Sequence, residues 1–396
     1  MASEAKRDET SGGSWLNNPE VRGVLYQVLT LALVVAVVWT FVHNAAVNLQ
    51  QRNIAQGFGF LGAQAGFDIS QSLIDYPKDS SYGRAILVGL ANTALVAGLG
   101  IVLATLLGFI AGIARLSSNF VIQKLATLYV EIVRNLPLLL QILFWYFAVL
   151  ALLPSPRQSL QPVSGWVFLN NRGLIIPEFV WTPASGEAVA GGLLVAILLS
   201  LGIRFWARRR QAATGQRFPT GWTSLGLIVG LPAIAFLATG SGLTVNAPTK
   251  STFNIAGGTR VIPEFMALLL ALVIYTGAFI AEIVRAGIMA VSHGQTEAAR
   301  SLGLRPGDTL RLVVVPQAMR VIIPPLTSQY LNLTKNSSLA VAVGYPDLVY
   351  TGGTVLNQTG QAIEVIAIWM LIYLGTSLAT SAFMNWFNGR MAIVER

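Results

Sequence analysis

Runs of apolar residues that are long enough to cross a lipid bilayer constrain the fold of this chain most strongly. A helix needs about 20 predominantly apolar residues to span the hydrocarbon core. Charged residues make up only 11% of the chain, against about 25% in soluble domains. The sequence therefore predicts an all-α polytopic membrane protein with about eight transmembrane helices. The eight stretches are 24–42, 85–114, 125–153, 188–206, 222–240, 265–290, 318–344 and 363–387.

Two of these stretches contain prolines within the apolar run. Pro137 lies in the stretch 125–153, which we still expect to form one span, and Pro324 and Pro325 lie in the stretch 318–344. Proline lacks a backbone N–H donor and disrupts a helix interior. Broken helices occur at membrane depth only where protein or water satisfies the freed backbone groups. The sequence therefore predicts that the seventh span is broken at its two adjacent prolines.

Lysine and arginine are unevenly distributed among the loops between the predicted spans. With the N-terminus in the cytoplasm, the inner loops and the C-terminal tail carry about twice as many of them as the outer loops. Such an excess is typical of cytoplasmic loops. We therefore expect both termini in the cytoplasm and the connections 43–84, 154–187 and 241–264 outside. These outer connections either face a soluble partner or are simply solvated.

The scarcity of reactive side chains excludes several classes of function. The chain has no Cys and two His residues, His43 and His293, which excludes disulfides, thiolate metal sites and a Cys nucleophile. It also lacks the Gly-x-x-x-x-Gly-Lys-Ser/Thr loop that cradles nucleotide phosphates. The net charge of +9 comes without a long basic run, so nucleic acid is not an expected partner. We expect no catalytic residue, no metal and no cofactor.

The inner loop after the sixth span predicts a helical elbow. Residues 296–302 favour a short helix, and Gly303 can terminate it in a left-handed conformation. A second helix is expected over 308–315, with Pro316 interrupting it. Such a rigid, basic projection suits docking into another protein. An ordinary amphipathic loop at the membrane interface is the alternative.

The spacing within this elbow carries a family resemblance. Glu297-Ala298-Ala299 is followed after three residues by Gly303, and after nine more intervening residues Val313 begins an aliphatic run that ends at Pro316. This order resembles the Glu-Ala-Ala signature of permease subunits of ATP-binding-cassette (ABC) importers. The flanking segments 275–288 and 316–339, with 129–139 upstream, are similar to the polar amino-acid branch of that family.

The resemblance implies a permease core of five helices, which are the second, third, sixth, seventh and eighth spans. The chain departs from the compact form by an added first span and by an insertion with two more spans, and in this it looks like general L-amino-acid permeases of proteobacteria. The implied division is a cytoplasmic tail (1–22), an extra span with an outer loop (23–84), the first part of the core (85–153), the insertion (154–263), and the second part of the core (264–390) with the coupling loop 291–316.

The same resemblance implies the partners. They are an ABC ATPase subunit that binds and hydrolyses ATP, a second and different permease subunit, a periplasmic binding protein and an amino-acid substrate, all at the inner membrane among its lipids. The chain itself would be a transport subunit and not an enzyme. Contact with the ATPase falls to the coupling-loop residues Gly294, Glu297, Ala298, Ala299, Gly303 and Pro316.

A four-residue motif with two charges occurs twice within the predicted spans. Glu131-Ile-Val-Arg134 recurs as Glu282-Ile-Val-Arg285, and in each copy the charges lie three residues apart on one helix face, where they can pair. Because the two spans run in opposite directions, both copies lie at a similar depth near the cytoplasmic end. They either gate a zwitterionic substrate or are structural ion pairs.

Lys335-Asn336-Ser337-Ser338 lies deeper in the bilayer than these motifs, on the span with the two prolines. This segment either contacts the substrate or buries Lys335 beside an acidic partner. The predicted translocation path therefore comprises Glu131, Arg134, Asn135, Glu282, Arg285, Lys335, Asn336, Ser337 and Ser338.

Two other classes of function remain to be weighed against an ABC importer subunit. A secondary amino-acid transporter would carry an inverted repeat and carboxylates deep in the bundle, whereas the acidic residues here lie mainly near the inner ends of spans. A membrane-embedded hydrolase would need a nucleophile with a base, or a metal site, and two separated His residues supply neither.

Overall fold

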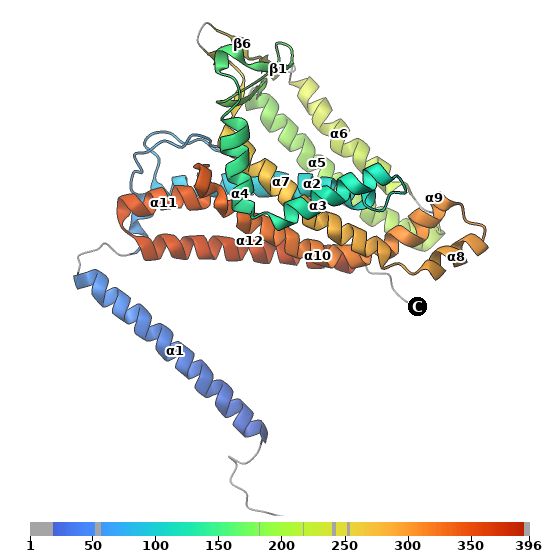
Figure 1. Cartoon of the computed structure of the whole chain (residues 1–396), viewed down its shortest axis with the longest axis horizontal. Coiled ribbons are helices and arrows are strands. Elements are labelled where there is room, and N and C mark those ends of the chain that lie inside the picture. The colour runs from blue at the N-terminus through green and yellow to red at the C-terminus, as the bar shows by residue number, and fades with distance from the viewer. Residues whose placement is uncertain are drawn as a thin grey trace, which may run out of the picture.

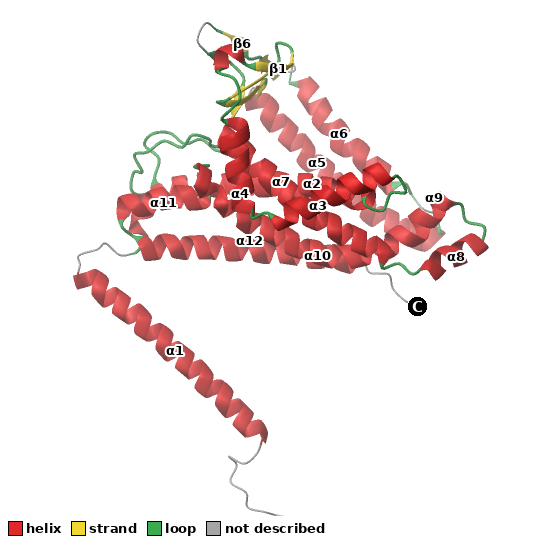
Figure 2. Ribbon diagram, viewed as in Figure 1, coloured by secondary structure: helices red, strands yellow, loops and turns green. Residues whose placement is uncertain are grey.

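The computed structural model describes residues 19–51, 57–181, 183–216, 218–239, 243–251 and 254–391. Within them, seven helices are long and apolar enough to cross a membrane, or eight if one bent helix pair counts as a single span. The predominantly helical membrane architecture expected from the sequence is confirmed, although short strands are also present. Figures 1 and 2 show long helices lying side by side, with a small group of strands at one end.

The helices of the described residues have the following bounds. The α-helices are α1 (Pro19–Gln51), α2 (Tyr82–Ala114), α3 (Phe120–Asn135), α4 (Leu138–Leu143), α5 (Pro183–Thr214), α6 (Thr220–Ala238), α7 (Pro263–Met289), α8 (His293–Ser301), α9 (Pro306–Thr309), α10 (Val315–Asn336), α11 (Leu348–Thr359) and α12 (Ala362–Met391). Short 3-10 helices are η2 (Phe58–Gly62), η4 (Pro156–Gln158) and η6 (Ser337–Val343), and two π-helical segments are η3 (Phe144–Leu150) and η5 (Leu310–Val314).

Helices α2 and α7 form the centre of the bundle and approach each other unusually closely. Small residues recur every fourth position along α2, at Gly100, Ala104, Gly108 and Gly112. A Cβ atom placed on Gly108 would lie 2.5 Å from Cβ of Ile280 on α7, and one on Gly112 would lie 2.7 Å from the carbonyl oxygen of Ala281. Such small-residue faces allow membrane helices to pack through backbone contact. Close packing of this pair fixes the position of the side chains where α2 ends and α7 approaches the elbow.

Three peripheral helices bury little of their apolar surface. None of the residues in the apolar stretch of α1 is buried, and only 11% and 6% of those in α5 and α6 are buried, the latter share being the same as in α12. Helices α5 and α6 pack on each other, and Gly192 lies where a Cβ atom would be 3.0 Å from the carbonyl oxygen of Leu231. Because exposed apolar surface of this extent is costly in water, lipid is the expected environment of these faces.

The stretch 125–153, expected as one span, is sharply broken. Helix α3 ends at Asn135, and the segment 138–150 continues at an angle of 108° to it. Leu136 adopts an extended conformation (φ −100°, ψ 131°) because it precedes Pro137. The Nε2 of Gln141 donates to the carbonyl oxygens of Val133 and Leu136, at 3.0 and 3.1 Å, and so satisfies backbone groups that the break leaves without helical partners.

The expected interruptions at Pro316, Pro324 and Pro325 are wrong. Helix α10 runs through Pro324 and Pro325, and Pro316 lies in its first turn, where a backbone N–H donor is not required. The irregularities lie on either side of α10 instead. The π-helical η5 precedes it, and beyond it η6 ends at Gly344 with φ +77°.

A group of short strands forms where the sequence predicted only loops. We call residues 154–181 and 243–262 the β module. Strands β1 (Leu160–Val163), β2 (Val167–Asn170), β3 (Gly173–Ile176) and β8 (Thr259–Val261) form one antiparallel sheet in that order. Two further antiparallel pairs are β4 (Glu178–Trp181) with β5 (Leu243–Asn246), and β6 (Thr249–Lys250) with β7 (Ile255–Ala256).

The β module and the elbow lie at opposite ends of α7. Strand β8 directly precedes α7, and α8 directly follows it, and Figure 1 shows the two features far apart. Helix α5 begins directly after β4, and α6 returns to β5. The segment 154–263, which the sequence predicted as an insertion, thus consists of the β module with a helical hairpin, α5 and α6, between its two parts.

The close approach of α2 and α7 predicts that a single methyl group will destabilise the bundle. Gly108→Ala places its Cβ within 2.5 Å of Ile280, and overpacking of this kind costs about 1–3 kcal/mol. The matched control is Gly98→Ala on the same helix, where nothing lies within 4 Å and alanine favours the helix by about 1 kcal/mol. We expect the thermal unfolding midpoint in detergent to fall for Gly108→Ala and to hold or rise for Gly98→Ala. Equal midpoints for the two variants would contradict this packing.

Candidate functional site

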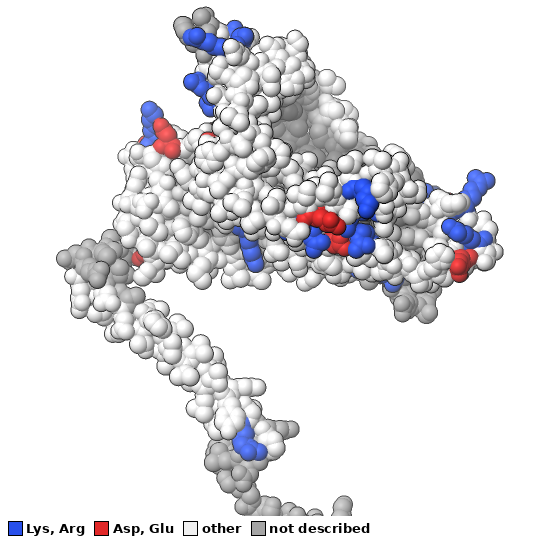
Figure 3. Space-filling model, in the orientation of Figure 1, with Lys and Arg blue, Asp and Glu red and all other residues white. Residues whose placement is uncertain are grey.

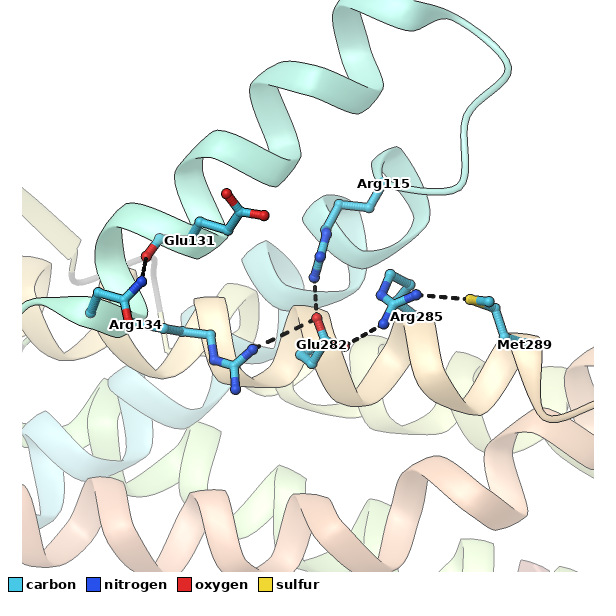
Figure 4. Close-up of polar contacts among 7 residues, drawn as sticks. Arg115, Glu131, Arg134, Glu282, Arg285 and Met289 are labelled. Atoms are coloured by element: carbon cyan, nitrogen blue, oxygen red, sulfur yellow. Dashed lines mark hydrogen bonds and ion pairs between the residues drawn. The ribbon is translucent and has the colours of Figure 1, made fainter.

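One carboxylate on α7, toward the elbow, contacts three arginines. Glu282 on α7 accepts a hydrogen bond from Nη1 of Arg115, the C-cap residue of α2, and another from Nη2 of Arg285 at 2.5 Å. The Nη1 of Arg134, in the last turn of α3, lies 3.7 Å from the same carboxylate. Figure 4 shows the three guanidinium groups converging on Glu282. We call these four residues the arginine cluster.

The expected pair within the first copy of the repeated motif does not form. Among the ion pairs of the described residues none involves Glu131, and Figure 4 shows its carboxylate directed away from Arg134. The guanidinium of Arg134 instead faces α7, where it lies over the ring of Phe279 at 5.1 Å. Asn135 donates to the carbonyl oxygen of Glu131 at 2.8 Å, a local contact within α3. Only the pair Glu282–Arg285 is present as the sequence predicted.

Sequence analysis missed Arg115 as a member of the cluster. It directly follows the apolar stretch 85–114, so the sequence predicts only a basic residue of a loop at this position. Its side chain is only 11% exposed, whereas that of Arg134 is 40% exposed. Arg115 is thus the structural partner of Glu282, and Arg134 is the member of the cluster that remains accessible.

A polar pocket opens between α7 and α10, next to the cluster. Its cavity volume is about 250 Å³. Phe279 joins the two features because Arg134 stacks on its ring while the ring lines the pocket. Amide and hydroxyl groups in an otherwise apolar bundle mark a place where a polar ligand can bind. The lining residues are Tyr275, Thr276, Phe279, Gln329, Asn332 and Asn336.

The predicted segment 335–338 does not act as one group. Asn336 lines the pocket, but Lys335 is exposed away from the bundle core. Ser337 is buried, and its hydroxyl donates to the carbonyl oxygen of Thr334 at 2.7 Å. The hydroxyl of Ser338 donates to the carbonyl oxygen of Lys335, also at 2.7 Å. Among the described ion pairs none contains Lys335, so the predicted acidic partner is not found.

Charged side chains are few on the helical body, as Figure 3 shows, and they gather where the arginine cluster lies and at the elbow. A positively charged group close to a polar pocket can hold a carboxylate. Three guanidinium groups share one carboxylate here, so the cluster retains excess positive charge near the pocket.

The end of α8 in the elbow has the local geometry that its sequence predicted. Helix α8 ends at Ser301, and Gly303 adopts φ +76°. The N–H of Leu304 donates to the carbonyl oxygen of Ala299 at 3.2 Å and that of Gly303 to Arg300 at 2.9 Å, an arrangement that closes many helices through a left-handed glycine. Nothing lies within 4 Å of a Cβ atom placed on Gly303, so its conformation and not its surroundings requires glycine.

The elbow presents its side chains outward from the bundle. Gly294, Glu297 and Ala298 are exposed, and Ala299 is buried against the rest of the elbow. Leu302 at the tip is 82% exposed. The Nε2 of Gln317 on α10 donates to Oε1 of Gln295 at 3.2 Å, which ties α8 to the start of α10. The elbow is therefore exposed on a frame that α8 and α10 hold together.

Comparisons with known proteins identify the family to which the chain is similar. The sequence profile of the family described as "Binding-protein-dependent transport system inner membrane component" matches residues 104–393. The chain is 56% identical over 384 residues to the General L-amino acid transport system permease protein AapQ of Rhizobium johnstonii, covering 97% of this chain and 95% of that protein. It is 52% identical to the Putative amino-acid ABC transporter permease protein YhdX of Escherichia coli, covering 99% of each. It is 44% identical to the Glutamate/glutamine/aspartate/asparagine transport system permease protein BztB of Rhodobacter capsulatus, covering 95% of each.

Proposed function

The chain belongs to the family of inner-membrane components of binding-protein-dependent transport systems, and we propose that it forms part of the translocation path for L-amino acids in an ABC importer. The names of its long relatives support the substrate class, since each is an amino-acid permease. A secondary transporter, the alternative left open by the sequence, gains no support from these relatives. The single observation that carries the proposal is the exposed elbow with its left-handed Gly303. A subunit without a nucleotide-binding loop can be driven by ATP hydrolysis only through contact with an ATPase subunit, and the elbow offers a surface for that contact.

We infer that the complex contains an ATPase subunit, a second permease subunit and a soluble binding protein. The family description itself supports dependence on a binding protein. ATP would be bound and hydrolysed by the ATPase subunit, which contacts Gly294, Glu297, Ala298 and Leu302 on the exposed surface of the elbow. The second permease is expected to be a different chain, as the general amino-acid systems resembled by this sequence pair two permeases.

The path proposed for the amino acid runs through the polar pocket and past Arg134. The pocket offers amide and hydroxyl groups from Thr276, Gln329 and Asn332 for the polar ends of a zwitterion. Arg134 is the accessible member of the cluster, and its longer contact with Glu282, at 3.7 Å, leaves it free to bind a passing carboxylate. The α-carboxylate is common to all amino acids, so this contact would admit many side chains.

The orientation that we propose has both termini in the cytoplasm, the elbow inside and the β module outside. The absence of Cys allows a clean labelling test. Gln161 in β1 and Thr214 at the end of α5 are both exposed. A Cys at Gln161 should react with a membrane-impermeant maleimide added to intact cells with a permeable outer membrane, and a Cys at Thr214 should react only after the inner membrane is opened. The reverse pattern would overturn the orientation.

The elbow is predicted to transmit the work of ATP hydrolysis to the helices. A valine at Gly303 must adopt a left-handed conformation that costs L-residues about 1–2 kcal/mol or more, so the end of α8 will be displaced. In proteoliposomes with the ATPase and the binding protein, Gly303→Val should reduce ATP-driven amino-acid uptake at least about tenfold, since 1.4 kcal/mol corresponds to a factor of ten.

The matched control is Gly307→Val in the same elbow. Gly307 has an ordinary backbone conformation and nothing lies within 4 Å of its Cβ position. This variant should retain most uptake. Co-purification of the ATPase will report assembly for both variants. Full uptake by an assembled Gly303→Val complex would refute the coupling role.

The arginine cluster predicts different effects for its least exposed and its most exposed arginine. Arg115→Gln removes a hydrogen bond to Glu282 at an 11% exposed position and should lower the thermal unfolding midpoint, because losing a charge-assisted hydrogen bond costs about 1.5–3 kcal/mol. Arg134→Gln should leave the midpoint almost unchanged and lower uptake about tenfold, the value of one charge-assisted hydrogen bond to substrate.

Arg134→Lys separates charge from geometry in the same test. A lysine retains the positive charge but lacks the planar fork that holds a carboxylate by two bonds, so it should restore uptake only in part. Normal uptake by Arg134→Gln would show that the cluster is purely structural and that the path runs elsewhere.

A further inference from the structure

The β module has its own small core and therefore presents its surface from a fixed frame. Phe168, Ile175 and Ile255 are buried together within it. Gly173 adopts φ +121°, and a Cβ atom there would lie 2.1 Å from the carbonyl oxygen of Val261. At this point the backbones of β3 and β8 are in direct contact, with no room for a side chain between them. A solvated connection would need neither a core nor such a contact. The module is built to hold its exposed side chains in place.

The exposed surface of the module is basic. Residues 154–181 and 243–262 contain four basic side chains, all exposed, and one acidic side chain, Glu178. The carboxylate of Glu178 already accepts a hydrogen bond from Asn246 at 3.2 Å. Figure 3 shows basic side chains across the module and no acidic one on the face in view. The basic residues are Arg157, Arg172, Lys250 and Arg260.

Two of these arginines are held side by side. The Nε of Arg260 on β8 donates to the carbonyl oxygen of Arg172, at the turn between β2 and β3, at 2.8 Å. Among the ion pairs of the described residues none contains Arg172, Lys250 or Arg260. Their charges are therefore not neutralised by carboxylates within the described part of the chain.

Large apolar side chains are exposed on the same module. Trp166 in the turn between β1 and β2 is 50% exposed, and Phe179 on β4 is 57% exposed. Tryptophan and arginine are the residues most enriched among the energetically dominant contacts of protein interfaces. Three of the four basic residues are arginines, which hold carboxylates through two parallel hydrogen bonds better than lysines do. The composition is that of a contact surface for an acidic protein face.

We propose that the β module is the docking surface for the acidic rim of the soluble binding protein that delivers the amino acid. The proposal rests on the function proposed above and extends it to the inserted segment. The module stands beyond the ends of α5 and α6 and at the end of α7 opposite the elbow (Figure 1), where a soluble partner outside the membrane can reach it.

The module is joined firmly to the helix that lines the pocket. Val261 and Ile262, at the end of β8, pack with Phe265 and Leu138 in one apolar cluster of the core. Helix α7 continues from there for 27 residues past the polar pocket and Glu282. A partner docked on the module is thereby connected to the lining of the pocket and, through α7, to the elbow.

The test neutralises the module and measures its dependence on the binding protein. Arg172→Gln, Lys250→Gln and Arg260→Gln are combined in the assembled complex in phosphatidylcholine liposomes. Uptake is recorded against the concentration of the periplasmic amino-acid-binding protein that supports transport by the wild-type complex. We expect half-maximal uptake to require about tenfold more binding protein at low salt, with an unchanged maximal rate, because rim charges act mainly on association. The difference should shrink as salt is added.

Two further variants control for charge and for folding. Arg208→Gln, Arg209→Gln and Arg210→Gln together remove the same charge from the far end of α5 and should leave the half-maximal concentration unchanged. Arg172→Gln with Lys250→Gln retains the side-chain bond of Arg260 to the sheet and should show an intermediate shift.

The outcomes distinguish this proposal from the function on which it rests. An unchanged half-maximal concentration in the module variant, with normal wild-type uptake, overturns the docking proposal alone. A shift that occurs only when the liposomes contain phosphatidylglycerol identifies anionic lipid as the occupant and also overturns it. If the wild-type complex shows no uptake that depends on a binding protein, the proposed function fails and the docking proposal fails with it.

Discussion

The close approach of α2 and α7 is the contact on which the rest of the molecule depends. Lipid provides no hydrophobic force between apolar helices, so their association relies on packing and polar contacts. Gly108 and Gly112 let the backbones meet without intervening side chains. Helix α10 packs on the same helix, with Ile322 beside Gly287 of α7. Because these surfaces are matched over several turns, Arg115 at the end of α2 arrives beside Glu282 without any loop having to place it.

Local signals in the sequence predicted the local features well. The apolar runs identified the long helices, and the position of Gly303 identified a left-handed helix end, since that geometry depends on a few neighbouring residues. The predicted break of α10 at its two adjacent prolines was wrong because Ile323, Leu326 and Leu333 bury that helix against its neighbours. The packing of these side chains outweighs the two missing backbone hydrogen bonds. The β module was missed because its sheet joins segments separated by α5 and α6, and no strand in it exceeds four residues.

The repeated Glu-Ile-Val-Arg motif shows how identical residues acquire different roles from their surroundings. Spacing along one helix allowed both copies to pair internally, and only Glu282–Arg285 does so. In the other copy, α3 ends one residue after Arg134 and faces α7, so the arginine is drawn to a carboxylate that already has two partners. The sequence could indicate which residues carry charge at this depth, but the partners depend on how three helices meet.

The unbroken course of α10 through two adjacent prolines has a mechanical consequence. Pro324 and Pro325 supply no N–H groups, so the carbonyl oxygens of Arg320 and Val321 lack the helical bonds they would otherwise accept. Bending stiffness in a helix depends on those bonds, and it is therefore lowest over this single turn. The turn lies between the end of α10 that joins the elbow and the end that lines the polar pocket. Helix α10 thus consists of two regular segments joined by one turn that bends more easily. Tilting one segment need not disrupt the packing of the other.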